Sequence, residues 1–351
     1  MKEEFRAAAE RIESNPLGRL MYGQRELFHS NLLAWFFDAL PVAADATFRA
    51  YAADGEGSER RVERERGHLD LVLRWPDRAP VVIENKVFSL PQREQLEEYE
   101  AATAGWRPAP SLVLLSMSAP QFELGSWQHF RYAELAERIR ASLPSQSTYE
   151  VETMRRYADL VADLDQLVAA VGVESNAEGV WLGDDLLSAI SSSQMRAALQ
   201  KARAQRVASY LARELRLSDQ PWSSMSRATP LIEIFQPVTV DRMSARAGWQ
   251  LQGAQFRRTI LFEDLGLQGR DKDSHRRREE VSRRHPELFA LPSSIEANRS
   301  GRKEFNHFAP DSVYQYAKVP ELTMGGLIAA AQEVKRSVDN FASATPASRQ
   351  S

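Results

Sequence analysis

Apolar and polar positions along the first half of the chain predict an alternation of helices and strands. Residues 22–40 place leucine and phenylalanine side chains at helical spacing, which indicates a helix with a broad apolar face. Three strand patterns follow at 60–66, 68–74 and 80–86. The first is charged, as in an exposed strand, whereas the other two are mostly apolar, as in buried strands.

A helix and further strands continue this order. Pro91 begins a helix that extends to about Ala102, because proline is tolerated in the first turn of a helix. Residues 111–117 form a fourth, mainly apolar strand pattern. A short strand and two helices are expected after it, at 129–132, 133–141 and 148–171. A meander of three strands, then a helix and another strand, predicts an α/β fold in which helices cover a mixed sheet.

The segment 172–184 is rich in glycine and polar residues, and it predicts a boundary between two domains. The first domain would span residues 1–174. Mixed helix and strand patterns after the boundary predict a C-terminal α+β domain at 185–343, which would recognise substrate or a partner. Residues 344–351 predict a disordered tail. The C-terminal helices are expected at 185–217, 274–289 and 322–342, and the strands at 230–240, 248–255 and 256–266.

Composition narrows the class of protein. The chain has 351 residues, of which 43% are hydrophobic and 26% charged, as in an ordinary soluble globular protein. It has no run of about 18 apolar residues, so we expect no membrane partner. Its charged N-terminal segment lacks the apolar core of a secretory signal. The absence of cysteine excludes disulfides and thiolate metal sites, and it fits a cytoplasmic location.

Charge is unevenly distributed between the two halves. Residues 1–174 carry 20 Lys and Arg against 28 Asp and Glu, a net charge of −8. The remainder carries 25 against 20, a net charge of +5. Two interpretations stay open: solvated helix faces with ordinary fluctuation, or an acidic metal-binding half beside a basic half that grips the substrate.

Two carboxylates and an amine stand in the two buried strand patterns. Asp70 lies in the first, and Glu84 and Lys86 lie two residues apart in the second, so these two share one face of the sheet. If the strands are neighbours, Asp70 and Glu84 can supply the oxygen ligands that Mg²⁺ prefers, and the peptide carbonyl of Asn85 can add another. Lys86 would then lie beside the attacking water or the scissile phosphate, as a point charge or a proton handler. A metal-dependent phosphodiesterase needs these groups.

Asp70, Glu84 and Lys86 are also compatible with two different kinds of site. A structural ion-pair network at a sheet end would contain the same groups, and a lone D…ExK spacing is common by chance. A glycosidase-type carboxylate pair is a further option, but it would leave Lys86 without a role. The setting of Asp70 and Glu84 in two apolar strands joined by a turn, with a QLEEY helix after them, favours the metal site.

This arrangement resembles the PD-(D/E)XK nuclease superfamily, and in particular a bacterial branch whose first helix carries an E-x-x-H-S motif. That motif and the apolar positions after it are matched by Glu26, His29, Ser30, Leu33, Ala34, Trp35, Phe36 and Phe37. The chain departs from the family at Leu69, where proline often stands, and in the turn DALPVAADATF after the first helix. The resemblance implies a restriction-endonuclease-like core, with a mixed β-sheet flanked by helices.

The resemblance also implies roles for individual residues. Asp70 and Glu84 would be the metal ligands and Lys86 the catalytic lysine. Glu26 would be the acidic residue of the first helix. Two further residues match the helix motif that follows the lysine, namely Gln95 and Tyr99. They are four positions apart on one helix face, so they could orient phosphate or Lys86.

The activity that the resemblance implies is that of a Mg²⁺- or Mn²⁺-dependent endonuclease. Its substrate would be nucleic acid, DNA in preference to RNA, and its setting bacterial antiviral defence or mobile-element biology. A homodimer or a defence-system partner protein is also expected. Two alternatives stay open: a catalytically inactive nucleic-acid-binding protein, and an assembly component whose second half mediates protein contacts.

Weaker signals each have an ordinary structural interpretation. His68 shares a sheet face with Asp70 and could contact phosphate, although a surface histidine is the commoner case. His29 and Ser30 could form hydrogen bonds behind the site or could simply pack the helix. The arginines at 60–66 fit a solvated edge strand better. A second basic and aromatic cluster suits either a nucleic-acid groove or a charged helix face; it comprises Arg276, Arg277, Arg278, Arg283, Arg284, Arg299, Arg302, Lys303, Phe305, His307, Phe308, Tyr314 and Tyr316.

Overall fold

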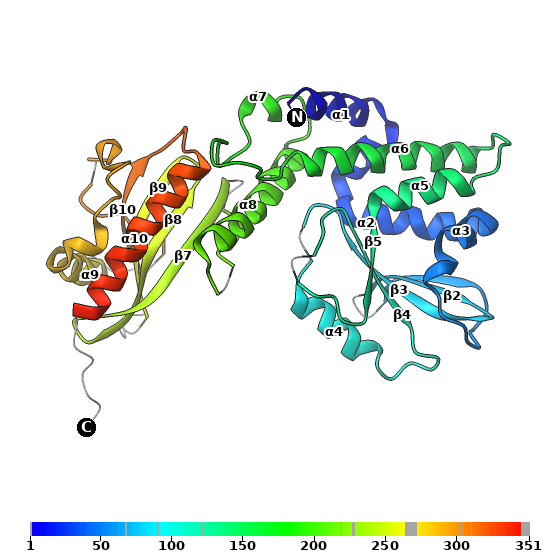
Figure 1. Ribbon diagram of the computed structural model, residues 1–351, viewed down its shortest axis with the longest axis horizontal. Helices are drawn as coiled ribbons and strands as arrows, with labels where there is room; N and C mark the ends of the chain where they lie inside the picture. Colours follow the sequence, from blue (N-terminus) through cyan, green and yellow to red (C-terminus); the bar gives the residue numbers. More distant parts are fainter. Residues whose placement is uncertain are drawn as a thin grey trace. The chain divides into compact units, whose positions relative to one another are not determined.

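In the computed structural model, the chain forms two compact units (Figure 1). Unit 1 comprises residues 1–172 and 184–202, and unit 2 comprises residues 173–183 and 203–351. The predicted pair of independent domains, with limits at 174 and 185, stays a prediction. The structure describes residues 2–66, 69–89, 91–120, 122–218, 220–226, 229–263, 272–301, 303–309 and 311–344, without the side chains of 23–26, 66, 272–275 and 277.

Unit 1 is built around a five-stranded mixed sheet in the order β1-β2-β3-β4-β5. β1 (Arg61–Arg66), β2 (Leu69–Trp75) and β3 (Arg78–Lys86) form an antiparallel meander. β4 (Ser111–Ser116) and β5 (Trp127–Arg131) then continue the sheet parallel to β3. The parallel step from β3 to β4 requires a crossover connection, and this connection contains helix α4. The predicted fold class, a restriction-endonuclease-like mixed sheet flanked by helices, is confirmed.

Helices lie on both sides of this sheet (Figure 1). One face packs on α4 (Arg93–Thr103), where Leu96 and Tyr99 join a core with Val72 and Leu114. On the other side, α2 contacts β1 to β3, and α5 contacts β5 and packs on α6 and α3. The bounds of the helices on this side are α1 (Lys2–Ser14), α2 (Pro16–Ala39), α3 (Pro41–Phe48), α5 (Tyr132–Ser142) and α6 (Tyr149–Ala169), and two short elements complete the unit, η1 (Arg49–Tyr51) and α7 (Asp184–Leu187).

Local sequence signals determine where α2 starts. The side chain of Asn15 accepts a hydrogen bond from the Leu17 amide at 3.0 Å, and Pro16 follows in the first turn. An N-cap asparagine and a proline at the first helical position both favour a helix start. The helix therefore begins six residues before the start at residue 22 that the apolar stripe predicts.

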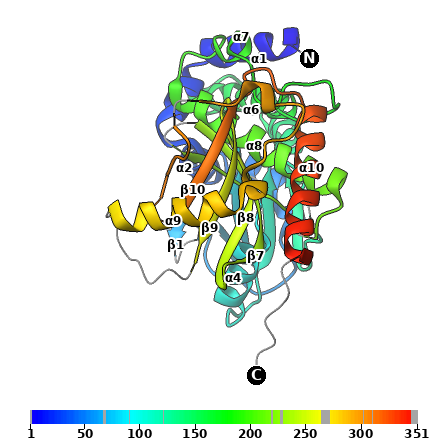
Figure 2. The ribbon, with the colours of Figure 1, turned by 90° about the vertical axis from the view of Figure 1, so that its left-hand side faces the viewer.

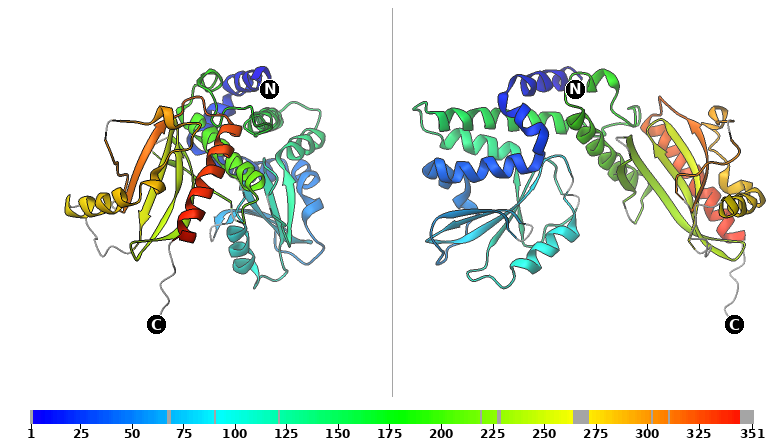
Figure 3. Two further views of the ribbon diagram at one scale, coloured as in Figure 1. Left: turned by 60° about the vertical axis from the view of Figure 1, so that its left-hand side comes forward. Right: turned by 180° about the vertical axis from the view of Figure 1, so that it is seen from behind.

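Unit 2 contains an antiparallel five-stranded sheet in the order β10-β9-β8-β7-β6 (Figure 2). Trp249 and Ile260 lie in the core of this unit with Leu327 and Val334 of helix α10, so α10 covers one face of the sheet. Figure 3 shows the strands in front of α10 when the molecule is seen from behind. Helix α8 (Ser193–Leu215) begins in unit 1 and belongs to unit 2 from residue 203 onward. The other elements of unit 2 are β6 (Trp222–Ser226), β7 (Thr229–Val240), β8 (Met243–Gln252), β9 (Gln255–Phe262), α9 (Lys272–Arg284), η2 (Pro286–Phe289), η3 (Glu296–Asn298), β10 (Ser312–Lys318) and α10 (Met324–Ala344).

Unit 2 differs from its predicted elements at the end of one helix and in its strands, among which β8 begins at Met243 and not at residue 248. The predicted helix 274–289 ends at Arg284, and Pro286 begins a short 3-10 helix, because proline cannot donate the hydrogen bond that would continue an α-helix. Strands β6 and β10 were not predicted. Apart from Ala344, the predicted tail lies outside the described residues. No helix in the described part of the chain combines the length and apolar character needed to cross a membrane.

Candidate active site

The register between β2 and β3 determines where the two carboxylates lie. Leu71 pairs with Ile83 and Val72 with Val82 in this antiparallel ladder. Continuing the ladder by one residue places Asp70 directly opposite Glu84. Cross-strand partners project from the same face of a sheet, so both carboxylates lie on the face that packs on α4.

Lys86 completes this cluster from the same strand as Glu84. Its amine lies 2.8 Å from Glu84 Oε1. The Glu84 side chain is 1% exposed and that of Lys86 13% exposed, whereas Asp70 is half-buried. The second oxygen of Glu84, Oε2, is buried and has no hydrogen-bond partner among the described residues.

Burial and like charge act on the protonation of this carboxylate. Desolvation raises the pKa of Glu84 well above its ordinary value, and the charge of Asp70 adds to the effect, while Lys86 opposes it. A carboxyl group in this environment favours its neutral form until a cation compensates the charge. A cation bound beside Asp70 and Glu84 would offset both the burial and the like charge.

Helix α4 brings two more of the expected residues to the cluster. Gln95 Nε2 donates a hydrogen bond of 2.9 Å to the Tyr99 hydroxyl, as their four-residue spacing on one helix face allows. Burial, followed by the charge of Glu84, raises the pKa of Tyr99 to about 12. Tyr99 is thus electrostatically coupled to the carboxylates, and Asp70, Glu84, Lys86, Gln95 and Tyr99 all meet at one place.

A set of hydrogen bonds behind the sheet holds β3 in position. The peptide N–H of Asn85 donates to Asp70 Oδ2 at 2.8 Å, which fixes the Asp70 side chain. The Asn85 side chain points to the opposite face, where its amide donates to Ser30 Oγ at 3.3 Å and its carbonyl oxygen accepts from the Tyr132 hydroxyl. Ser30 therefore supports the site through Asn85. The carbonyl of Asn85 as a metal ligand stays a prediction.

His29 has a separate environment in the core of unit 1. It is fully buried, and its Nδ1 lies 3.0 Å from the hydroxyl of Tyr157. Burial lowers the pKa of His29 to about 3, so the ring is neutral at physiological pH. These contacts favour the interpretation of His29 as a packing residue.

Three further expectations concern Glu26, His68 and the arginines of the 60–66 segment. The side chain of Glu26 and residue His68 lie outside the described residues. Arg60 pairs with Asp45 and stacks on Phe37, which agrees with the structural interpretation of the 60–66 segment.

The donor set meets the needs of a divalent cation. Mg²⁺ is usually held by one or two carboxylates, with waters and substrate phosphate oxygens as its remaining ligands. Asp70 and Glu84 fit this requirement, and the buried Glu84 Oε2 is an oxygen atom that can coordinate a cation. No group of three or more His, Asp or Glu side chains suited to a metal occurs among the residues that the structure describes. Two carboxylates alone could therefore hold such a cation only with waters or substrate oxygens as its other ligands.

Comparison with known proteins agrees with this chemistry. A family model described as the PD-(D/E)XK nuclease superfamily matches residues 17–105, a segment that contains Asp70, Glu84, Lys86, Gln95 and Tyr99. The expected resemblance to this superfamily is thereby confirmed, and the match supports a nuclease-type function. No curated protein and no solved structure matches the chain.

Proposed function

We propose that this protein is a Mg²⁺-dependent endonuclease that hydrolyses phosphodiester bonds in DNA. One observation carries the proposal: the β2–β3 register sets Asp70 opposite Glu84, with the Lys86 amine 2.8 Å from Glu84. The match of residues 17–105 to a nuclease superfamily supports nucleic acid as the substrate class. The proposed setting, bacterial defence or mobile-element biology in the cytoplasm, rests on the family resemblance.

Each side chain of the cluster has a role in this reaction. A divalent cation, when bound, supplies charge that stabilises the phosphoryl oxygens and favours ionisation of a nearby water. Asp70 and Glu84 would hold this cation. Lys86 is positioned by Glu84 so that its amine can interact with the scissile phosphate or move a proton at the attacking water. Gln95 and the Tyr99 hydroxyl can donate hydrogen bonds to a phosphate oxygen at the same face.

Cleavage assays with single substitutions test the proposal. Supercoiled plasmid, single-stranded DNA and RNA would each be incubated with the full chain in Mg²⁺, in Mn²⁺ and in EDTA. We expect EDTA to abolish cleavage, and Asp70→Asn, Glu84→Gln and Lys86→Met each to lower the rate by about 100-fold or more, as removal of one transition-state-stabilising group does elsewhere. Asp77→Asn, in the exposed β2–β3 turn, is the matched control and should cleave like the wild type.

Two results would contradict the proposal. Equal cleavage by the wild type and by all three site variants would assign the activity to another site or to a contaminant. Absence of cleavage of all substrates, in either metal, would favour an inactive nucleic-acid-binding protein or an assembly component. Thermal unfolding of each variant, followed by circular dichroism, would separate loss of chemistry from loss of fold.

A further inference from the structure

The sheet of unit 2 has a second face whose composition is unlike that of its core. The face that α10 covers is mainly apolar, with Trp249, Ile260 and Val313 in the core, and it also carries the buried Arg258 opposite Trp249. Residues that alternate with these project from the opposite face, which we call the outer face. Five residues align across it in register, one from each strand: Trp222, Glu233, Gln250, Arg257 and Tyr316.

Three aromatic rings and one guanidinium gather at the β9–β10 side of the outer face. Tyr314 and Tyr316 are two residues apart on β10, and their ring centroids are 6.2 Å apart. Phe308 lies 5.8 Å from Tyr314 on its other side. The guanidinium carbon of Arg257 is 4.9 Å from the centroid of Tyr314 and 6.0 Å from that of Phe308. We call Phe308, Tyr314, Tyr316 and Arg257 the aromatic platform.

The rings of this platform are accessible and not part of a core. Phe308 is 44% exposed, and both tyrosines are partly exposed. An exposed phenylalanine gains little from its position in the folded chain, because its ring stays in contact with water. Aromatic rings that remain accessible and share one sheet face with a cation are characteristic of surfaces on which planar ligands stack.

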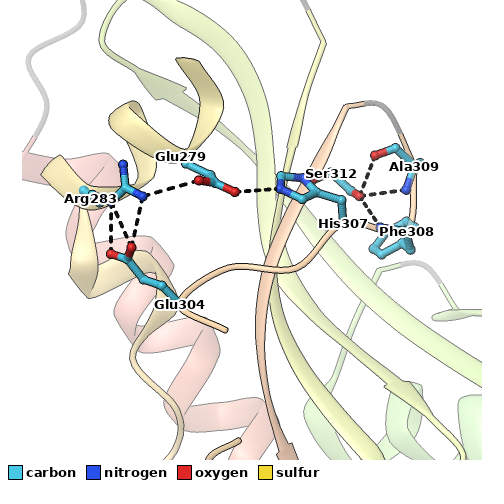
Figure 4. A network of polar contacts seen from close by, with 7 residues as sticks. All are labelled: Glu279, Arg283, Glu304, His307, Phe308, Ala309 and Ser312. Carbon is cyan, nitrogen blue, oxygen red and sulfur yellow. Dashed lines mark hydrogen bonds and ion pairs between the residues drawn. The ribbon is translucent and has the colours of Figure 1, made fainter. Parts of the chain in front are cut away.

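A polar network holds Phe308 in place despite its exposure (Figure 4). The amides of Phe308 and Ala309 each donate a 2.9 Å hydrogen bond to Ser312 Oγ. His307 Nδ1 lies 2.6 Å from the Ser312 carbonyl, and its Nε2 lies 3.0 Å from Glu279. The turn that carries Phe308 is thus attached both to β10 and to α9. The backbone at Phe308 is thus held in place, so a ligand that stacks on this ring orders less of the chain on binding.

Arg257 is also fixed in position by its neighbours. It donates a 2.7 Å hydrogen bond to Gln250 Oε1 and a 2.9 Å bond to Gln255 Oε1, and no carboxylate lies within ion-pair distance of it in the described part of the chain. Arg257 is itself buried, at 8% exposed, so its positive charge acts on the faces of Tyr314 and Phe308 and is not open to solvent. Lys318, two residues beyond Tyr316 on the same face, is exposed.

Two arginines at the end of α9, Arg283 and Arg284, do not contribute to this platform. Arg283 pairs with Glu279 and Glu304, and Arg284 pairs with Asp241. Their charges are compensated, as in an ordinary solvated helix face. The basic and aromatic residues of the expected cluster therefore lie in different environments. The cation that contacts Phe308 and Tyr314 is Arg257, on the neighbouring strand β9.

We propose that the aromatic platform binds unstacked bases of single-stranded nucleic acid. The inference takes its ligand class from the proposed nuclease function, but its residues are separate from those of the metal site. Every base has a flat face that can stack on an aromatic ring, whereas the bases of a duplex are already stacked on each other. The exposed Lys318 matches the negative charge of the strand, as does the net charge of +5 on residues 175–351.

Fluorescence anisotropy in EDTA tests this inference without cleavage. The full chain would be titrated into labelled single-stranded DNA, single-stranded RNA and duplex DNA of equal length. We expect both single strands, or one of them, to bind more tightly than the duplex, and Phe308→Ala and Tyr314→Ala each to weaken single-strand binding by about 5- to 150-fold, the range for loss of one stacked base. Phe308→Leu should weaken it similarly and Phe308→Tyr should not, because only a ring can stack.

A matched control and two contrary outcomes make the test decisive. Tyr149→Ala removes an exposed aromatic residue of unit 1, 78% exposed, and should leave binding unchanged. Wild-type affinity in Phe308→Ala and Tyr314→Ala would overturn the inference, as would equal affinity for single strands and duplex or no binding at all. If the protein cleaves nucleic acid with Mg²⁺ but Phe308→Ala and Tyr314→Ala bind single strands as tightly as the wild type, only this inference is refuted. If the two substitutions weaken single-strand binding but the wild type cleaves no substrate in Mg²⁺ or Mn²⁺, only the proposed nuclease function is refuted.

Discussion

At the scale of single residues, the hydroxyl of Tyr132 connects helix α5 to the strand that carries Glu84 and Lys86. It donates to the Asn85 side chain, and both residues are buried. Tyr132→Phe would leave the Asn85 oxygen without this donor, so we expect the free energy of unfolding to fall by about 1–3 kcal/mol. Urea denaturation measures this loss. Tyr149→Phe, at an exposed tyrosine, should change it by less than about 0.5 kcal/mol, and equal effects of the two substitutions would contradict the argument.

A second residue-level prediction concerns the pH dependence of stability. Because burial lowers the pKa of His29 to about 3, the unfolded chain takes up a proton below about pH 6.5 that the folded chain does not. Above that pH, His29 does not change the free energy of unfolding. Below it, protonation of His29 in the unfolded chain lowers the free energy of unfolding progressively as the pH falls toward 3. Between pH 6.5 and 5 we expect a loss of about 1–2 kcal/mol from this residue.

His29→Gln removes the titrating group and keeps a polar side chain. Urea denaturation of the wild type and this variant at pH 7, 6 and 5 isolates the contribution, since the carboxylates titrate alike in both proteins. The variant should lose less stability than the wild type on acidification, whatever its stability at pH 7. Parallel pH profiles for the two proteins would show that His29 is not the source.

At the scale of secondary-structure elements, the β7–β8 pair depends on a glycine. A Cβ atom at Gly248 would lie 2.0 Å from the carbonyl oxygen of Ile234, which is part of the neighbouring strand's backbone. Gly248→Ala must therefore displace a central strand, and we expect it to cost about 1–3 kcal/mol or more. Gly105→Ala, where nothing lies within 4 Å of the added atom, is the control. Similar midpoints of thermal unfolding for the two variants would contradict this expectation.

Elements with a strong apolar pattern could be predicted from the sequence, and weakly patterned ones could not. Strands β2, β3 and β4 could be predicted because both faces of the unit 1 sheet are covered, so their sequences are nearly continuous apolar runs. β10, with the sequence SVYQYAK, has tyrosines at 314 and 316 where a fully buried strand would have aliphatic residues, because that face of the strand is not part of the core. Its strand character depends on pairing with β9, which is a tertiary contact.

The candidate site shows the same division between local and long-range information. Asp70, Glu84 and Lys86 could be grouped because one turn joins their strands, so the sequence spacing nearly determines the pairing. The bond from Asn85 to Ser30 joins residues 55 positions apart, and it depends on how α2 packs on the sheet. Arg257 was missed as the partner of Tyr314 for the same reason, since no local pattern relates β9 to the end of the chain.

At the scale of the whole molecule, chemistry and strand binding are assigned to different units, so their kinetic signatures should separate. Phe308→Ala should raise KM for single-stranded DNA by about 5-fold or more and change kcat little, since it removes binding that is equal in the ground and transition states. Glu84→Gln should lower kcat by about 100-fold or more and leave the affinity in EDTA close to that of the wild type. Steady-state kinetics with a single-stranded substrate, alongside anisotropy, measure both quantities. Sites without shared partners act additively, so a large fall in kcat for Phe308→Ala, or a loss of binding in Glu84→Gln, would show that the two sites act as one.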